Sequence, residues 1–491
     1  MPSLLLEQIE RHATQRPSAL AAVESGADGD AVSINWRQFR DAIGALAFSL
    51  RWRFEPGSII LLIAPSSVRY LIAFHACLAA DMTVFPLSVH STPSERLHAA
   101  RQSGAAGCIS EGEPADAMKL LNVAHIPLHS VPIDGAGPIA SQALSSFSGE
   151  SSMLLQSSGT TGLPKIVRRS LSALIAVGEN CRRFVGMTPD DRMLAVIPIS
   201  HSYGIDHAVL AATLAGCTVE LSAGFDAART AARLASQQIT LFPAVPFIFE
   251  ALVQSSANSQ KLTRLRHAFS AGSPLPRRVF DAFHHSFDVP IGQIYGSTEF
   301  GSITFNDPTI APFDPLSVGR PMCGVKLRIV DRDEPRMDAP LPANTEGQLA
   351  VAAASMFDAY LAQRDSALTD GWFLPADLAR LDEHGRLTIT GRTKLLIDVG
   401  GLKVNPLEVE AALAEHPDVR EAIVVPVSLS ETVQRVKAFI VWREGAGDLG
   451  DLRAFAQKHL APHKVPRVFE ECESLPRTPT GKVLRSALQT T

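Results

Sequence analysis

The sequence lacks several features that would place it in a common class of protein. Its formal net charge of −5 provides no broad basic field, so nucleic acid is not an expected partner. Its six cysteines contain no C-x-x-C pair, which indicates free thiols in a reducing compartment, most of them packed as small hydrophobic side chains. The N-terminus has no basic segment followed by an apolar run, so we expect no signal peptide and a cytoplasmic location.

Long apolar runs are also scarce. The most apolar helical stretch covers residues 70–87, but His75 and Asp81 interrupt it, so we predict a buried helix there and no transmembrane segment. The chain has 491 residues, of which 46% are hydrophobic and 19% charged. This composition is ordinary for a soluble globular protein, and the length predicts about two to four structural units.

Helical and strand patterns alternate along most of the chain. Apolar residues spaced by three or four predict a helix over residues 36–50, with Asn35 as its N-cap. Unbroken apolar runs at 59–64 and 193–197 predict strands that are buried on both faces. We therefore predict an α/β fold with a large N-terminal domain, residues 1–393, of layered, mostly parallel sheets with helices.

The last third of the chain has a different pattern. Short alternating runs from residue 347 onward indicate a β-rich subdomain of the large domain. Residues 394–491 combine strand patterns with a helix, whose start is marked by Asn405 as cap and Pro406 as first residue. We predict that these residues form a small, separate α+β C-terminal domain.

Residues 157–165, rich in hydroxyl groups and glycine, are the most informative stretch. Glycines let backbone N–H groups approach an anion, hydroxyls add donors, and Lys165 adds a charge suited to phosphate. The spacing is not that of a Walker P-loop, because Lys165 is followed by Ile166. Taken alone, the stretch fits a flexible surface loop equally well.

Further motifs follow this stretch in a defined order, and together they are more specific than any one of them. They occupy residues 295–299, 371–377, 391–394, 400–406 and 479–482. In this order the set resembles the adenylate-forming superfamily: acyl-CoA synthetases, aryl-CoA ligases, peptide-synthetase adenylation domains and beetle luciferase. The resemblance extends over essentially the whole chain and is closest to the acyl-CoA synthetases.

The resemblance implies a site for ATP and Mg²⁺. Glu299 would be the magnesium ligand, Thr298 would contact the α-phosphate, and Lys482 would stabilise charge in the adenylation transition state. Residues 295–299 also follow an apparent strand end at Ile294, where α/β enzymes bind ligands. The expected ATP-binding residues are Ser157, Ser158, Gly159, Thr160, Thr161, Gly162, Lys165, Gly272, Ser273, Pro274, Tyr295, Gly296, Ser297, Asp377 and Arg392.

Each of these residues also has a plain structural explanation outside the family context. Glu299 would be a surface glutamate in a turn, and Lys482 a solvated lysine near the chain end. Asp377 would cap a turn while Arg392 makes a surface ion pair.

The resemblance also implies an acyl site around a histidine. His201 would lie beside the carboxylate of the substrate, although it also fits a residue that only orients the acid. An apolar wall at 242–249 contains no charged residue, which favours a fatty or aryl acid over an amino acid. Asp206 keeps the amino-acid alternative open. The expected acyl-binding residues are His201, Ser202, Tyr203, Gly204, Phe247 and Gly272.

A thiol would accept the acyl group in a second step. In the family, the small domain is mobile and rotates about a hinge, which corresponds to Lys394. Gly400 and Gly401 would then approach the thiol, with Lys403 close by. Coenzyme A is the expected acceptor, and the phosphopantetheine of an acyl carrier protein is the alternative.

The sequence departs from the family pattern at a few positions. Ile166 replaces the usual glycine of the phosphate loop, and residues 375–376 lack the glycine usually found before Asp377. Asp398 occupies a position where many relatives have lysine, and residues 478–480 replace an asparagine-containing lead. None of these changes removes a charged group from the adenylation step, although Asp398 leaves the acceptor less certain.

The sequence therefore predicts an AMP-forming acid–thiol ligase. It would convert a fatty or aryl acid and ATP to acyl-AMP and pyrophosphate, and then form a thioester. A catalytically weakened binding or scaffold protein is the alternative from another class. Retention of Lys165, Glu299, Asp377, Arg392 and Lys482 argues against it.

Overall fold

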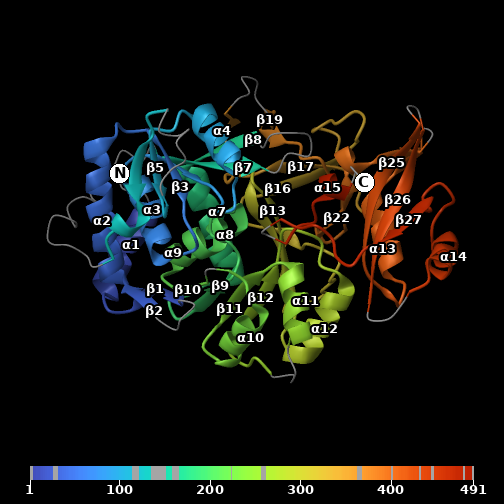
Figure 1. The fold of residues 1–491 in the computed structure, drawn as a ribbon, viewed down its shortest axis with the longest axis horizontal. Coiled ribbons are helices and arrows are strands. Elements are labelled where there is room, and N and C mark those ends of the chain that lie inside the picture. Colours follow the sequence, from blue (N-terminus) through green and yellow to red (C-terminus); the bar gives the residue numbers. More distant parts are fainter. Residues whose placement is uncertain are drawn as a thin grey trace. The chain divides into compact units, whose positions relative to one another are not determined.

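In a computed structural model, the chain forms two compact units (Figure 1). The first unit contains residues 1–326 and 352–367, and the second contains residues 327–351 and 368–491. The domain boundary predicted at residue 394 lies inside the second unit, so a separate domain from that residue onward stays a prediction. The structure describes residues 4–25, 31–112, 121–133, 151–157, 165–222, 224–255, 261–361, 368–399, 402–430, 433–443, 447–478 and 481–488.

The first unit contains a nine-stranded sheet whose central strands are parallel. From β13 to β1 every neighbouring pair is parallel, and antiparallel strands complete both edges. The order across the sheet is β15 (Arg320–Pro321), β14 (Gly301–Asn306), β13 (Ile291–Ser297), β12 (His267–Ser270), β11 (Leu241–Ala244), β9 (Arg192–Ala195), β10 (Thr218–Ser222), β1 (Leu20–Ser25), β2 (Ala31–Asn35).

A seven-stranded sheet of the first unit has a parallel core and an antiparallel edge. From β7 to β6 the neighbouring pairs are parallel, whereas β8 and β18 are added antiparallel at one side. The order is β18 (Ala359–Tyr360), β8 (Lys165–Ser170), β7 (Ser152–Ser157), β4 (Thr83–Pro86), β3 (Ile59–Ile63), β5 (Gly107–Ser110), β6 (Ala124–Pro127).

Helices accompany both sheets of the first unit. Their bounds are α1 (Leu4–Gln15), α2 (Trp36–Arg53), α3 (Val68–Ala79), α4 (Pro93–Ser103), the 3₁₀-helix η1 (Leu128–Ser130), α7 (Leu171–Val185), α8 (Ser202–Gly204), the π-helix η2 (Ile205–Ala211), α9 (Ala212–Ala215), α10 (Ala227–Ala235), α11 (Pro246–Ser255) and α12 (Arg277–Phe287).

The sequence patterns of the first unit are largely confirmed. Helix α2 begins after Asn35, whose side chain accepts a hydrogen bond from Gln38 N while the Gln38 side chain accepts one from Asn35 N. This capping box satisfies backbone donors that a helix start leaves unpaired. Strand β3 coincides with the apolar run predicted at 59–64 and is buried on nearly its whole length.

The prediction of one continuous helix over residues 70–87 was wrong. Helix α3 ends at Ala79, and β4 begins at Thr83. Between them, Asp81 adopts a φ of 58°, in the left-handed region that a continuing helix cannot contain. Apolar composition without periodicity did not distinguish a buried helix from the buried strand that follows it.

The second unit is built mostly of antiparallel strands. A six-stranded sheet contains the predicted β-rich part, and a smaller sheet pairs β25 with β26 antiparallel and β26 with β27 parallel. The bounds are β16 (Lys326–Val330), β17 (Gly347–Ala352), β19 (Leu368–Thr369), β20 (Trp372–Phe373), β21 (Asp377–Leu381), β22 (Leu387–Arg392), the 3₁₀-helix η3 (Thr393–Leu395), β23 (Ile397–Val399), β24 (Leu402–Val404), α13 (Pro406–Ala414), β25 (Val419–Ser430), β26 (Val433–Trp442), α14 (Leu449–His459), β27 (Val468–Glu471) and α15 (Arg485–Leu488).

The predicted start of α13 is confirmed. The Asn405 side chain accepts a hydrogen bond from Leu407 N, and Pro406 is the first helical residue. Asn405 also donates from its side chain to the carbonyl of Thr390, at 2.6 Å, so the cap is tied to strand β22.

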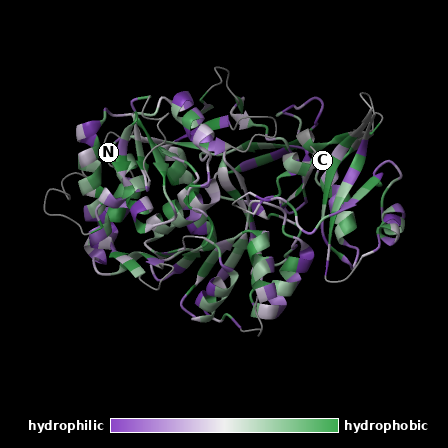
Figure 2. Ribbon diagram, in the orientation of Figure 1, coloured by the Kyte–Doolittle hydropathy of each residue, from purple (hydrophilic) through white to green (hydrophobic). Residues whose placement is uncertain are grey.

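Buried side chains of both units are mainly apolar. Figure 2 shows hydrophobic colour along the strands and hydrophilic colour on parts of the helices. Four of the six cysteines are buried, and all six are free thiols, as predicted. Among the helices that the structure describes, none combines the length and apolar character needed to cross a membrane.

Candidate active site

The turn that carries Glu299 connects β13 and β14 in the first unit. Strand β13 continues to Ser297, three residues beyond the end predicted at Ile294, so Tyr295 and Gly296 lie inside the strand rather than after it. The turn comprises residues 298–300. Thr298 and Glu299 therefore lie at the tip of an antiparallel hairpin, where pairing of the two strands fixes their position.

Two hydroxyl groups hold the Glu299 carboxylate. Ser297 Oγ donates to Oε2 at 2.9 Å, and Tyr360 Oη donates to Oε1 at 3.2 Å. Burial raises the pKa of the Tyr360 hydroxyl, and the adjacent Glu299 raises it further, so the tyrosine is the donor of this bond. Each carboxylate oxygen can still accept a second partner.

Lys165 lies on the other side of Tyr360. Its ammonium nitrogen is 4.6 Å from the centroid of the Tyr360 ring, within the range of a cation–π contact. The side chain of Lys165 is exposed, as expected for a group that receives a ligand. The structure therefore brings together two predicted residues, Lys165 and Glu299, through a tyrosine that the sequence analysis did not select.

The segment predicted to bind the acid forms the short helix α8. Gly204 allows the close approach of this segment, since a Cβ atom there would lie 2.4 Å from the carbonyl oxygen of Pro198. Tyr203 Oη donates to the Phe269 carbonyl at 3.0 Å. His201 precedes the helix; burial lowers its pKa, and its buried Nε2 has no partner among the described residues. A neutral imidazole with an unused nitrogen is suited to contact a substrate.

Apolar residues predicted as a wall belong to β11 and α11. Phe242 and Phe249 are fully buried in one hydrophobic cluster, and their rings contact each other edge to face at 5.7 Å. Phe247 differs from them, because 41% of it is exposed and its ring lies 6.1 Å from that of Phe225. Of these three phenylalanines, Phe247 alone is exposed, and its role in acyl binding stays a prediction.

Asp206 is part of a buried ion pair and is not available to bind an amine. Its Oδ1 accepts from Arg169 Nη1 at 3.3 Å, and both side chains are almost completely inaccessible. Its Oδ2 accepts from the backbone and the hydroxyl of Ser302, at 2.9 and 3.1 Å. Asp206 lies in the π-helix η2, directly after the acyl segment, and such helices are frequent near functional sites.

The segment with the predicted ATP-binding residues Gly272, Ser273 and Pro274 follows β12. Gly272, Ser273 and Pro274 are exposed. Gly272 adopts a φ of 88°, which residues with a side chain rarely adopt. The chain can therefore turn sharply at the carboxyl end of a parallel strand, the end at which α/β sheets bind ligands.

In the second unit, Asp377 and Arg392 are direct partners across β21 and β22. The two residues face each other in register, and Arg392 Nε donates to Asp377 Oδ1 at 2.7 Å. Asp377 is buried, whereas the Arg392 side chain is about one-third exposed. The turn without glycine before Asp377 is held by Thr393, whose backbone N–H donates to the Ala376 carbonyl at 2.7 Å.

Lys482 lies close enough to this pair to be affected by both charges. The surrounding protein lowers the pKa of its ammonium group, Arg392 lowers it further, and Asp377 acts in the opposite direction. Lys482 is nevertheless exposed in terms of surface area. Asp377 and Lys482 are more than one hundred residues apart in the sequence, yet the charge of Asp377 acts on Lys482 in the structure.

Two arginines hold the chain on either side of Lys482. Arg477 pairs with Glu421 of β25 and donates to the Gly481 carbonyl at 2.8 Å. Arg485 pairs with Glu410 of α13 and donates to the Val424 carbonyl at 2.7 Å. The chain is therefore attached to the fold on both sides of Lys482.

Ile166 is part of the core of the first unit. It belongs to β8, is 4% exposed, and packs in the apolar cluster that contains Leu61, Phe85 and Leu154. A larger residue at this position thus contributes to the core.

Part of the predicted site lies outside the described residues. This applies to Ser158, Gly159, Thr160, Thr161, Gly162, Gly400 and Gly401. The backbones of Ser157, Lys394 and Lys403 are described, in β7, η3 and β24 respectively, but their side chains are not. The phosphate loop, the hinge and the thiol-binding residues therefore stay predictions.

Sequence reasoning missed Tyr360 and Arg169. Neither lies in a motif, and no local pattern marks them. Tyr360 reaches Glu299 only because β18 pairs with β8, and Arg169 reaches Asp206 only because β8 passes the π-helix.

Comparisons with known proteins match the chain to a family over most of its length. The AMP-binding enzyme family matches residues 9–361, and the AMP-binding enzyme C-terminal domain matches residues 408–482. A 4-coumarate–CoA ligase of Oryza sativa subsp. japonica is 28% identical, over 88% of this chain and 84% of its own length. The sulfoacetate–CoA ligase of Cupriavidus necator is 32% identical, over 68% of this chain and 66% of its own length.

The fold also matches a solved structure over nearly its full length. The O-succinylbenzoate–coenzyme A synthetase of Bacillus subtilis, solved with ATP and a magnesium ion, is 22% identical, with coverage of 99% for both chains and a TM-score of 0.84. The family match covers well over half of the chain, including the segments that carry Lys165, His201 and Glu299. The chain therefore belongs to the AMP-binding enzyme family, within the adenylate-forming superfamily of AMP-forming acid–thiol ligases.

Proposed function

We propose that this enzyme activates an apolar carboxylic acid with ATP and transfers the acyl group to coenzyme A. A carboxylate oxygen attacks the α-phosphorus of ATP, and the bond to the bridging oxygen breaks, so pyrophosphate leaves with the electron pair. The thiol then attacks the carbonyl carbon of the acyl-AMP, and AMP leaves. Formation of an acyl-CoA through an adenylate is what the family membership supports most directly.

The ion pair of Asp377 and Arg392, whose charges also act on Lys482, is the observation that carries this proposal. A carboxylate suits the two hydroxyls of a ribose, and a nearby ammonium group suits the charge that develops at the α-phosphate. In the second unit the charges of Asp377 and Arg392 both act on Lys482.

The donor set around Glu299 fits a magnesium ion. Mg²⁺ is bound in such sites by one or two carboxylates together with phosphate oxygens and water. In the part of the chain that the structure describes, no three histidine, cysteine or acidic side chains gather as a metal cluster. Glu299 would therefore hold a magnesium ion that shares its remaining ligands with ATP, and the ion would supply charge neutralisation of the phosphates.

An apolar acid is favoured by two observations on Asp206 and on Phe247. The carboxylate that could have bound an amine, Asp206, is committed to Arg169 and Ser302. Phe247 presents an exposed aromatic ring from α11. Of the relatives named above, one acts on an aryl acid, 4-coumarate, and one on a small charged acid, sulfoacetate, so the proposed class, fatty or aryl, rests on the residues of this chain.

Coenzyme A is the proposed acceptor because the relatives named above are coenzyme A ligases. An acyl carrier protein would present the same thiol and stays the alternative. Saturation by a carrier protein at low concentration, with salt-sensitive association, would favour that alternative. A cytoplasmic location accords with the free thiols.

Carboxylate-dependent exchange between ATP and pyrophosphate tests the first step without an acceptor. We expect exchange with members of a fatty or aryl acid panel and none with amino acids. Exchange with an amino acid alone would contradict the proposed substrate class. No exchange with any acid, in a protein that binds ATP, would favour the binding or scaffold alternative.

Lys482→Ala tests the residue on which the proposal depends. We expect the exchange rate to fall about 100- to 1000-fold while ATP affinity is nearly unchanged, because the charge acts mainly in the transition state. The matched control is Lys458→Ala, an exposed lysine of α14, which should leave the rate unchanged. An unchanged rate in the Lys482 variant would remove this residue from the mechanism.

A further inference from the structure

Tyr360 lies between two groups of opposite charge. Its hydroxyl donates to Glu299 at 3.2 Å, and its ring face receives the ammonium of Lys165 at 4.6 Å from the centroid. The tyrosine therefore contacts the predicted metal ligand with one part and the predicted phosphate-binding lysine with another.

The backbone fixes Tyr360 in this position. Hydrogen bonds on both sides of it join β18 to β8, from Asp358 N to the Arg168 carbonyl at 2.8 Å and from Leu361 N to the Ile166 carbonyl at 2.9 Å. Phe357 N donates to the carbonyl of Glu299 at 2.7 Å. The short strand is thus attached both to the strand that begins at Lys165 and to the turn of Glu299.

A lysine and a glutamate in one site attract each other when no nucleotide is bound. A direct ion pair would engage the two charges that ATP and its metal need, and it would have to break before they bind. Tyr360 gives each group a neutral partner instead: a ring face for the ammonium and a hydroxyl for the carboxylate. Among the described residues, Glu299 forms no ion pair, and its second oxygen is also held by a hydroxyl, that of Ser297.

We propose that Tyr360 is a positioning residue that keeps Lys165 and Glu299 apart and oriented toward a metal–nucleotide complex. Neutral contacts are weaker than an ion pair and are easily exchanged for phosphate and metal, so the charges stay available. The proposal rests on the ATP-dependent function proposed above. It assigns a role to a residue that touches neither the acid nor the transferred group.

Two substitutions separate the hydroxyl from the ring. In Tyr360→Phe the ring still faces Lys165 but the bond to Glu299 is lost. In Tyr360→Leu both contacts are lost, and Lys165 can pair with Glu299. The control is Tyr70→Phe, because the Tyr70 hydroxyl is buried and has no partner among the described residues. Removing that hydroxyl should therefore leave nucleotide binding unchanged.

Calorimetric titration of ATP, with and without Mg²⁺, gives a readout that is independent of turnover. For Tyr360→Phe we expect affinity for ATP alone to be unchanged and the gain in affinity from Mg²⁺ to fall about 3- to 10-fold. For Tyr360→Leu we expect both affinities to fall. In the exchange assay, excess Mg²⁺ should restore the rate of the Phe variant toward that of the wild type.

The outcomes distinguish this inference from the proposed function. If the wild type binds ATP with Mg²⁺ and both variants bind it equally well, the role of Tyr360 is refuted and the function stands. If Tyr360→Phe and Tyr360→Leu lose the same affinity for ATP, with and without Mg²⁺, the ring has no role beyond that of the hydroxyl. The inference that Tyr360 keeps Lys165 and Glu299 apart is then wrong. If the wild type does not bind ATP, the proposed function and this inference are both overturned.

Discussion

Two buried carboxylates of the first unit, Asp206 and Glu220, pair with arginines that differ in their access to water. Asp206, next to the acyl segment, pairs with Arg169, whose side chain is 0% exposed. Glu220, in β10, pairs with Arg192 and Arg233, whose side chains are 25% and 27% exposed. Both carboxylates are buried, but only the arginines of Glu220 have access to water.

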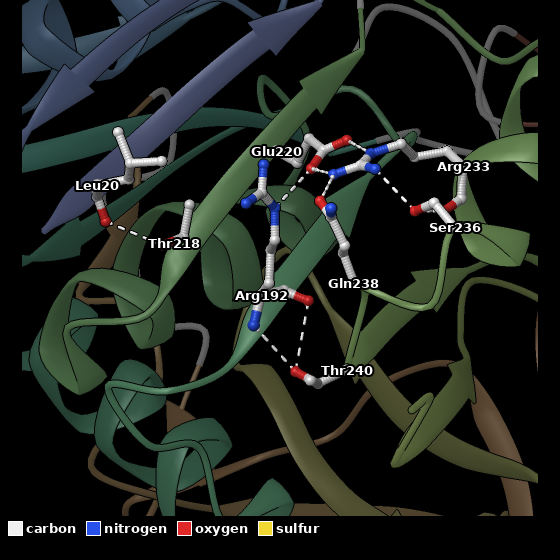
Figure 3. Close-up of polar contacts among 8 residues, drawn as sticks. All are labelled: Leu20, Arg192, Thr218, Glu220, Arg233, Ser236, Gln238 and Thr240. Atoms are coloured by element: carbon white, nitrogen blue, oxygen red, sulfur yellow. Dashed lines mark hydrogen bonds and ion pairs between the residues drawn. The ribbon is translucent and has the colours of Figure 1, made fainter. Parts of the chain in front are cut away.

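The arginines around Glu220 have more partners than Arg169 has. Figure 3 shows its carboxylate between the guanidinium groups of Arg192 and Arg233. Arg192 Nε and Arg233 Nη2 each donate to Oε2 at 2.7 Å. Arg233 also donates to Ser236 and to Gln238, at 2.7 and 2.9 Å. Every charge in this cluster thus has several partners or water.

The Asp206–Arg169 pair has fewer hydrogen-bond partners, and both of its side chains are buried. Nε and Nη2 of Arg169 are buried and have no partner among the described residues. The pair joins β8, which begins at Lys165, to the helical segment that follows His201, and Ser302 adds β14. A buried pair of this kind is weak evidence for stability, but removing one partner is costly. We therefore expect the cost of losing one partner to depend on whether water can replace it.

Arg169→Met should reduce the free energy of unfolding more than any other variant considered for these two ion pairs. It leaves the Asp206 carboxylate buried without a cation, so we expect a loss of about 3–5 kcal/mol in the free energy of unfolding. Chemical denaturation of the first unit measures it. The control is Arg277→Met, because the Arg277–Asp281 pair has side chains 61% and 53% exposed and should contribute less than about 1 kcal/mol. Equal losses in the two variants would contradict the importance of burial.

Glu220→Gln should have a smaller effect. The amide keeps the size of the side chain, and both arginines can turn toward water once the negative charge is lost. We expect a loss of about 1–2 kcal/mol in the same measurement. A loss as large as that of Arg169→Met would show that access of the arginines to water does not decide the cost.

The pH dependence of stability should have opposite signs for Asp206 and Glu220. These effects should be smaller than those of the two substitutions above. Burial raises the pKa of Asp206, whereas for Glu220 burial is outweighed by hydrogen bonds from Arg233 and Arg192, so its pKa is lowered. A lowered pKa gives stability that is lost as pH falls below about 4.5, and a raised pKa gives stability that is lost as pH rises above about 3.8.

The expected measurement is the difference in unfolding free energy between wild type and each charge-removing variant from pH 7 to 3. The advantage of the wild type over Glu220→Gln should shrink toward low pH. Relative to Asp206→Asn, the wild type should gain stability over the same change. Parallel curves for the two variants would contradict the opposite pKa directions.

Local patterns predicted much of the fold. Apolar spacing located α2, and the Asn405–Pro406 pair located the start of α13, because caps and periodicity act over a few residues. The same reasoning failed at residues 80–87, where a buried strand has no period to detect. It also ended β13 too early, because the continuation depends on pairing with β14.

The motifs predicted which residues would gather around a nucleotide, and the structure brings several of them together within each unit. Asp377 and Arg392 are partners across two strands, and Lys482 lies within range of both charges. These residue types suit phosphate, ribose and metal by their own chemistry, so the sequence could indicate them. It could not indicate whether Asp206 was free, since that depends on Arg169.

The sequence by itself determined the residue types and their order: a lysine suited to phosphate, an acidic turn, a carboxylate suited to ribose hydroxyls and a lysine near the end of the chain. These follow from side-chain chemistry and from turn and cap propensities, which are local. Only the tertiary structure decided their partners. Tyr360 stands between Lys165 and Glu299, and Asp206 is taken by Arg169, because strand pairing brings together residues that are distant in the chain.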